Sequence, residues 1–258
     1  MNLPIITTEQ VETFLLIFIR VSTMIIVIPI LGERFVPVRV QAGLSLLVSV
    51  LIFPIIQAQT PKLSSDVLAL FLRMGGEVLI GVVIGMTARI IFAGIQLAGQ
   101  LIGFQMGFSI VNVIDPAYSD QVSIIAEFQY LIALLLFLVL NGHHIFLYAV
   151  AESFRILPPL TFHFSGPLME AILGYVNAMF EIAVKTGAPI IAVLFFLSVG
   201  LGLIARTVPQ INIFIVGFPL QIAVGLIGIG VTMPLFVNVV EKYFLHMEEE
   251  IYSLLKLM

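Results

Sequence analysis

One short stretch interrupts an otherwise apolar chain of 258 residues: GFQMGFSIVNVIDPAYSD, residues 103–120. Its glycines continue a four-residue spacing that starts at Gly99. Its Asp115–Pro116 step disfavours helix at the residue before the proline, so we expect a helix to end before Asp115. The intervening residues are bulky, apolar and almost uncharged, whereas a loop in water is normally polar. The loop is therefore expected to pack against protein.

The spacing of the glycines predicts a close contact between helices. Gly99, Gly103 and Gly107 recur every four residues, which places them on one face of a helix. Such a strip of small residues allows another helix to approach closely in a membrane. Glycine is frequent in membrane helices, so the spacing gains weight from its direct continuation into the apolar loop. We expect these three glycines to serve close helix packing.

Composition indicates a membrane protein. Hydrophobic residues make up 60% of the chain, charged residues 10%, and the mean hydropathy is +1.18. Because a soluble domain carries about a quarter charged residues, this chain must face lipid or other protein. The net charge of −4 and the lack of a basic run argue against nucleic-acid binding. Without cysteine, neither disulfides nor thiolate metal sites can form.

Apolar stretches recur along the whole chain, and each approaches the roughly 20 residues that a helix needs to cross a bilayer. Within lipid the backbone must satisfy its own hydrogen bonds, so these stretches predict an all-α, multi-pass integral membrane protein. We find no clean internal repeat and no disordered linker, which favours a single domain over residues 1–258. The stretches are 11–31, 40–58, 68–88, 90–110, 123–141, 176–204 and 211–238.

The distribution of basic residues predicts an orientation if all seven stretches cross once. One side would then hold most of the Lys and Arg residues, and the positive-inside rule would place the N-terminus outside the cytoplasm and the C-terminus inside. The junction at 88–90 is too tight for a comfortable turn, so a hairpin that never fully crosses is the alternative. The residues on the richer side are Arg34, Arg39, Arg89, Arg155, Lys242 and Lys256.

Charged residues inside the apolar stretches need partners. Arg73 and Glu77 lie four residues apart, as do Glu181 and Lys185, and each pair can neutralise itself along one helix face. The alternative is that one member of a pair reaches another subunit. Arg20 has no acidic residue within one turn, so we expect it to find a partner on another helix or to extend to a membrane interface.

A second polar cluster, RTVPQINIFIVGFPLQ, occupies residues 206–221. Arg206, Gln210 and Asn212 supply hydrogen-bonding groups at the junction of the last two long stretches, and Pro209 and Pro219 bend it. A tight helix–helix turn with capping side chains explains these residues. A contact with another subunit is the alternative, because buried amides bridge helices in lipid.

The residues needed for enzymatic chemistry are not found in a recognised pattern. Ser109 lacks the second glycine of a nucleophile elbow, and Asp115 and Asp120 stand in the loop after the glycines rather than inside a membrane-length apolar stretch. His143 and His144 are adjacent and would point about 100° apart on a helix, which does not suit a shared metal. We therefore expect no catalytic, cofactor-binding or metal site.

Three stretches together resemble the FliR family in their order and spacing. This family comprises flagellar export-gate subunits related to the T-type component of type III secretion injectisomes. The resemblance covers essentially the whole chain. The stretches are ILGERFVPVRVQAGLSLLVSVLIFP (30–54), GQLIGFQMGFSIVNVIDP (99–116) and RTVPQINIFIVGFPLQIAVG (206–225).

The resemblance implies an architecture and a set of partners. The chain would consist of long helical hairpins, with a FliP-like part joined to a FliQ-like part, much of it displaced towards the periplasm. It would assemble with FliP-like and FliQ-like subunits, with FlhB-like and FlhA-like proteins nearby. The location implied is the bacterial inner membrane, within the flagellar basal body, and the passengers are unfolded flagellar proteins.

The resemblance also implies roles for individual residues. The segment 106–122 resembles a plug that fills the closed pore, and five polar residues elsewhere would hold contacts between subunits. The plug residues are Met106, Phe108, Ile110, Val111, Val113, Ile114, Asp115 and Pro116, and the contact residues are Arg73, Glu77, Arg206, Gln210 and Asn212.

The function expected from this resemblance is a subunit that helps to form and seal the flagellar type III export channel. Bulky apolar groups can block ions by dewetting a constriction. No nucleotide or proton site is visible in the sequence, so the driving energy would enter through partners. An injectisome subunit is one alternative. A secondary transporter is another, although such proteins usually show related halves.

Overall fold

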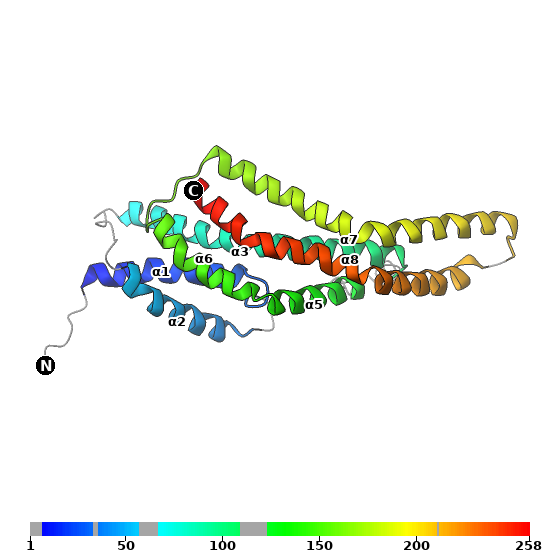
Figure 1. Cartoon of the computed structure of the whole chain (residues 1–258), viewed down its shortest axis with the longest axis horizontal. Coiled ribbons are helices and arrows are strands. Elements are labelled where there is room, and N and C mark those ends of the chain that lie inside the picture. Colours follow the sequence, from blue (N-terminus) through cyan, green and yellow to red (C-terminus); the bar gives the residue numbers. More distant parts are fainter. Residues whose placement is uncertain (1–6, 33–35, 57–66, 109–122, 211) are drawn as a thin grey trace. The chain divides into compact units, whose positions relative to one another are not determined.

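Every described element is an α-helix (Figure 1). A computed structural model describes residues 7–32, 36–56, 67–108, 123–210 and 212–258; the side chains of 67–70, 72, 73, 213 and 214 are excepted. The all-α prediction is confirmed. The helices are α1 (Thr8–Val27), α2 (Val38–Ile56), α3 (Val67–Gln105), α5 (Ile124–Val139), α6 (Gly142–Ile156), α7 (Gly166–Thr207) and α8 (Ile213–Leu257).

The chain divides into two compact units, and three long helices contribute residues to both. Unit 1 comprises Met1–Arg89, Asn141–Tyr175 and Phe244–Met258. Unit 2 comprises Ile90–Leu140 and Val176–Tyr243. The prediction of a single domain over 1–258 stays a prediction.

Unit 1 is organised around α1. Thr7 and Gln10 form a capping box at its start, so two backbone N–H groups of the first turn are satisfied. Phe14 of α1 stacks edge-on against Phe53 of α2, with 6.0 Å between the ring centroids. On the other side, α1 packs closely against α3 at Gly81. A side chain at Gly81 would not fit there, because its Cβ would overlap Thr23. These contacts bury one face of α1, including Arg20.

Unit 2 contains the connected parts of α7 and α8, here called the α7–α8 hairpin (176–207 and 213–243), which pack against α5 and the second half of α3. The core of unit 2 is formed by residues from four helices. Ile102 lies in the last turn of α3 and Met106 directly after it. Ile125 lies on α5, Leu194 on α7 and Ile229 on α8. Phe92 of α3 contacts both Tyr130 and Phe137 of α5, with centroid distances of 5.3 and 5.9 Å.

The prediction of seven crossings is wrong. The stretch 68–88 and most of the next one, 90–105, belong to one uninterrupted helix, α3, of 39 residues. Ala88, Arg89 and Ile90 contain no turn-forming residue, so the backbone continues through the supposed junction. The orientation predicted from the distribution of basic residues assumed seven crossings, so it no longer has a basis. The alternative of a hairpin with its turn at 88–90 is excluded as well, because α3 is continuous there.

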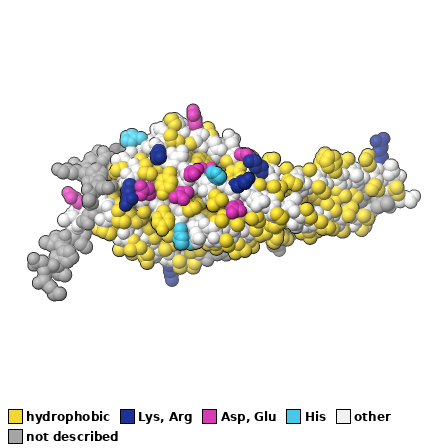
Figure 2. All heavy atoms as spheres, viewed as in Figure 1, with side chains coloured by type: hydrophobic (Ala, Val, Ile, Leu, Met, Phe, Trp, Pro, Cys, Tyr) yellow, Lys and Arg dark blue, Asp and Glu magenta, His cyan; other side chains and the backbone are white. Residues whose placement is uncertain are grey.

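Among the described residues, five helices are long and apolar enough to cross a membrane, or six spans result if α5 and α6, which are bent at their break, form one. Many large apolar side chains are exposed, and hydrophobic side chains cover much of the visible surface in Figure 2. Such a surface needs lipid or protein around it. The multi-pass membrane prediction is therefore confirmed.

Candidate functional site

The glycine strip of α3 lies against the first turn of α5. A Cβ on Gly99 would overlap the backbone of Ala126, and a Cβ on Gly103 would overlap the hydroxyl of Ser123. The Ser123 hydroxyl donates a hydrogen bond to the carbonyl of Gly99 at 3.4 Å. The absence of side chains at Gly99 and Gly103 therefore lets the α5 backbone come close to α3 at the start of the candidate plug.

Gly107 has a different role, because it ends the helix rather than continuing the strip. Its φ of +89° is a left-handed conformation that glycine adopts at little cost. Gly107 N–H donates to the carbonyl of Phe104 and Phe108 N–H to that of Gly103, both at 3.1 Å. These two bonds form a Schellman motif, which closes α3 well before Asp115.

Met106 is fully buried in the core of unit 2, and Phe108 is partly buried against the same cluster. The Met106 side chain occupies a notch above Gly225 of α8, where an added Cβ would lie 2.6–2.7 Å from its Cγ, Sδ and Cε atoms. The ring of Phe218, also on α8, lies against Gly107, where an added Cβ would be 2.6 Å from Phe218 Cδ1. The first residues of the candidate plug are therefore fixed by packing on α8.

The remaining predicted plug residues lie outside the described part of the chain. They are Ile110, Val111, Val113, Ile114, Asp115 and Pro116.

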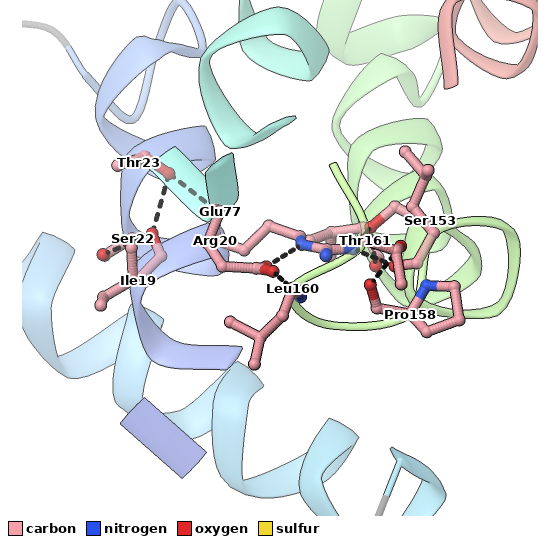
Figure 3. A network of polar contacts seen from close by, with 11 residues as sticks. Ile19, Arg20, Ser22, Thr23, Glu77, Ser153, Pro158, Leu160 and Thr161 are labelled. Atoms are coloured by element: carbon pink, nitrogen blue, oxygen red, sulfur yellow. Dashed lines mark hydrogen bonds and ion pairs between the residues drawn. The ribbon is translucent and has the colours of Figure 1, made fainter. Parts of the chain in front are cut away.

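A buried ion pair joins three helices of unit 1. Arg20 of α1 and Glu77 of α3 are 57 residues apart, yet Arg20 Nε donates to Glu77 Oε2 at 2.7 Å, and both side chains are fully buried. Arg20 Nη1 also donates to the Ser153 hydroxyl of α6 at 3.1 Å (Figure 3). The same atom donates to the Leu157 carbonyl, also at 3.1 Å. The guanidinium thus finds its partner on another helix, as one of the sequence hypotheses required.

The second oxygen of Glu77 binds the segment that follows α6. Leu160 N–H donates to Glu77 Oε1 at 2.9 Å (Figure 3), and Leu160 has a φ of 71°, which is unusual for a residue with a side chain. The ring of Phe154 lies 4.0 Å from Arg20 Cζ and covers the guanidinium. Arg20 and Glu77 together therefore position the connection between α6 and α7.

The predicted contact residues do not form one cluster. Glu77 is occupied inside the chain, and the side chain of Arg73 is outside the described set. Arg206 and Gln210 are exposed at the end of α7 and in the turn that follows, and the exposed Asn212 immediately precedes α8. Three of the five positions are thus exposed at the α7–α8 turn.

Two of these arrangements were missed by the sequence interpretation. Glu77 was paired with Arg73 because the two stand four residues apart, and the only signal for Arg20 was its isolation in an apolar stretch. The Met106–Gly225 contact had no sequence signal, since the two residues are remote in the chain.

His143 and His144, whose side chains were expected to point in different directions, have ring centroids 4.3 Å apart. In the part of the chain that the structure describes, no three acidic or histidine side chains group as metal ligands.

Comparison with known proteins covers nearly the whole chain. The family described as "Bacterial export proteins, family 1" matches residues 11–247. The flagellar biosynthetic protein FliR of Bacillus subtilis is 40% identical over 247 residues, which is 95% of either chain. The Escherichia coli protein of the same name is 34% identical over 254 residues, covering 97% of this chain and 95% of its own. The chain therefore belongs to the FliR family of bacterial export proteins.

Proposed function

We propose that the protein is a subunit of the flagellar export apparatus, in the bacterial inner membrane at the flagellar basal body. The observation that carries this proposal is the 40% identity to a flagellar biosynthetic protein over 95% of both chains. The relatives are flagellar biosynthetic proteins, which favours the flagellar system over an injectisome. The long apolar helices support a place in the membrane.

Within that apparatus, the protein helps to form and seal the channel for unfolded flagellar proteins. The sealing element is the segment 106–122, whose apolar residues can exclude water and ions from a constriction. Met106 and Phe108 hold the start of this segment on the core of unit 2. A plug of apolar side chains can move aside for a passenger and close again without a nucleotide site.

FliP-like and FliQ-like subunits complete the gate, with FlhB-like and FlhA-like proteins beside it. The exposed Arg206, Gln210 and Asn212 at the α7–α8 turn are suited to contacts between subunits, since they offer hydrogen-bonding groups beside apolar helix surface. The energy for export enters through these partners. The role of this chain is structural rather than enzymatic.

Purification tests the assembly. When the tagged full chain is extracted from membranes in a mild detergent, FliP-like and FliQ-like proteins should co-purify in fixed ratios. The control is an unrelated multi-pass protein with the same tag and expression level. Recovery of the chain alone, from cells that assemble flagella, would contradict the proposal.

Conductance tests the sealing role. Shortening the chain within 109–122, with Met106 and Gly107 retained, should raise the ion conductance of the assembled gate in a planar bilayer. The matched control shortens 57–66, another connection between helices that carries no proposed sealing role. Equal conductance of the two shortened proteins and the unaltered gate would refute the plug.

A further inference from the structure

The two longest helices exceed the thickness of a membrane, so their length does not say which part crosses. Helix α7 has 42 residues and α8 has 45. At 1.5 Å per residue each rises more than about 60 Å, twice the hydrocarbon core of a bilayer. The position of the membrane on these helices must come from their chemistry.

Charged residues bound one interval of α7. Residues 186–205 contain no Asp, Glu, Lys, Arg or His, with Lys185 immediately before them and Arg206 immediately after. These 20 residues rise about 30 Å, which equals the thickness of the hydrocarbon core. On α8 the charge-free run is longer: it covers 213–240, which rises about 42 Å, and Glu241 and Lys242 follow it.

A polar belt marks one edge of this interval on both helices. Glu181 and Lys185 form an ion pair of 2.6 Å on α7, and both side chains are about half exposed. Tyr243 of α8 lies beside them, with 5.8 Å between Lys185 Nζ and its ring centroid. Tyrosine and snorkelling lysine are typical of the boundary between lipid tails and headgroups.

Between the polar belt and the turn that joins α7 to α8, the two helices are apolar on the side that faces away from their mutual contact. The two helices contact each other through Gly228 and Ile190, and the Gln221 amide donates to the Ser198 hydroxyl at 3.0 Å. Away from that contact the large side chains are exposed: Phe196 is 72% and Ile227 66% exposed. In Figure 2 hydrophobic side chains predominate among the coloured side chains on the visible face of this end of the hairpin.

We propose that bilayer lipid covers the outer face of the α7–α8 hairpin between the Glu181–Lys185–Tyr243 belt and Arg206. On α7 the charge-free length matches the hydrocarbon core and charged groups stand at both of its ends, and large apolar side chains such as Phe196 on α7 and Ile227 on α8 are exposed. This inference rests on the membrane location proposed above and not on export itself.

The chain has no cysteine, so single cysteines can report depth directly. Phe196→Cys and Ile227→Cys probe the middle of the interval, and Phe180→Cys and Val208→Cys are matched exposed positions beyond its two edges. Each full-length variant is purified with its assembly, spin-labelled and reconstituted in phosphatidylethanolamine–phosphatidylglycerol vesicles. Collision rates of the label with oxygen and with a water-soluble nickel chelate are then measured.

At Phe196 and Ile227 we expect oxygen collisions to exceed nickel collisions several-fold, and at Phe180 and Val208 we expect the reverse. Equal nickel access at all four positions would place the hairpin in water and overturn the proposal. Immobile labels at Phe196 and Ile227 that neither reagent reaches would show that a partner's helix covers the face, which also overturns it. Failure of the assembly function appears separately, as loss of co-purifying subunits or of motility.

Discussion

At the scale of single residues, Arg20 and Glu77 show what a buried charge requires. The guanidinium is satisfied by a carboxylate, a hydroxyl, a carbonyl and an aromatic face from α3, α6 and the segment after α6. Of the three guanidinium nitrogens of Arg20, Nη2 is the one without a hydrogen-bond partner among the described residues. Because removing one partner strands the other, the pair stabilises unit 1 only as a pair.

Glu77→Ala should therefore destabilise the protein strongly. The substitution leaves the Arg20 charge buried and unpaired and also frees Leu160 N–H, so a loss of about 3–5 kcal/mol in unfolding free energy is expected. Thermal unfolding of the purified protein in detergent measures the loss. The control is the double variant Arg20→Met with Glu77→Gln, which removes both charges and should be less destabilised than Glu77→Ala. A double variant at least as unstable as Glu77→Ala would show that the charge pairing is unimportant.

Gly225 provides a second residue-scale prediction. A Cβ there meets the Met106 side chain at 2.6–2.7 Å, so Gly225→Ala should cost about 1–3 kcal/mol through overpacking. Gly230→Ala on the same helix is the matched control, since nothing lies within 4 Å of its added Cβ. Alanine there should be neutral or stabilising by up to about 1 kcal/mol. Equal melting temperatures of the two variants would contradict the Met106 notch.

At the scale of elements, the end of α3 depends on one backbone conformation. Gly107→Ala places a Cβ on a residue with a φ of +89° and against the ring of Phe218, so it should cost at least about 1–2 kcal/mol. Gly200→Ala on α7, where an added Cβ meets nothing within 4 Å, serves as the comparison. Thermal unfolding of the two variants side by side makes the measurement. A melting temperature unchanged by Gly107→Ala would show that the left-handed residue is dispensable.

The sequence predicted most helices but not all their limits. Hydropathy located α1, α2 and α5 within a few residues, because each is one apolar run with polar or turn-forming residues at its ends. Hydropathy predicted two helices in place of α3, because stretches were assigned at the length of one membrane crossing and α3, with 39 residues, is longer. It missed α6, whose His, Glu and Arg residues lower its hydropathy although one of its faces is buried.

The candidate site was predictable only where its signal was local. The glycine spacing and the apolar loop could be found in one short stretch, and the family resemblance gave that stretch a role. Arg20–Glu77 and Met106–Gly225 join residues that are remote in the chain, so neither partner could be chosen from spacing. Proximity along the helix favoured Arg73 for Glu77, whereas packing of α1 on α3 provided Arg20.

At the scale of the whole molecule, unit 1 is completed by the last segment of the chain. Phe244, Met247, Ile251 and Leu254 of that segment are buried. The Ser165 hydroxyl donates to the Leu257 carbonyl at 2.6 Å, and His163 N–H donates to the Met258 carbonyl at 2.9 Å. The segment before α7 is thus held by the end of α8.

Removal of residues 244–258 should therefore loosen unit 1 more than unit 2. Hydrogen exchange in α1 and α6 should accelerate, because buried apolar contacts are lost there, while α5 should retain its protection. The comparison is Ser165→Ala, which removes a single hydrogen bond and should change exchange only near residue 165. Uniform acceleration in α1, α5 and α6 would contradict a separate role for the segment.

The Arg20–Glu77 pair also has a consequence for synthesis. The ribosome makes Arg20 57 residues before its carboxylate partner, and Ser153 and Leu157 emerge later still. Until Glu77 is made, the first helix carries an unpaired positive charge that resists entry into the lipid core. The charge of the first helix is therefore balanced only after α3 has been made, so the burial of α1 is completed by residues that are synthesised later.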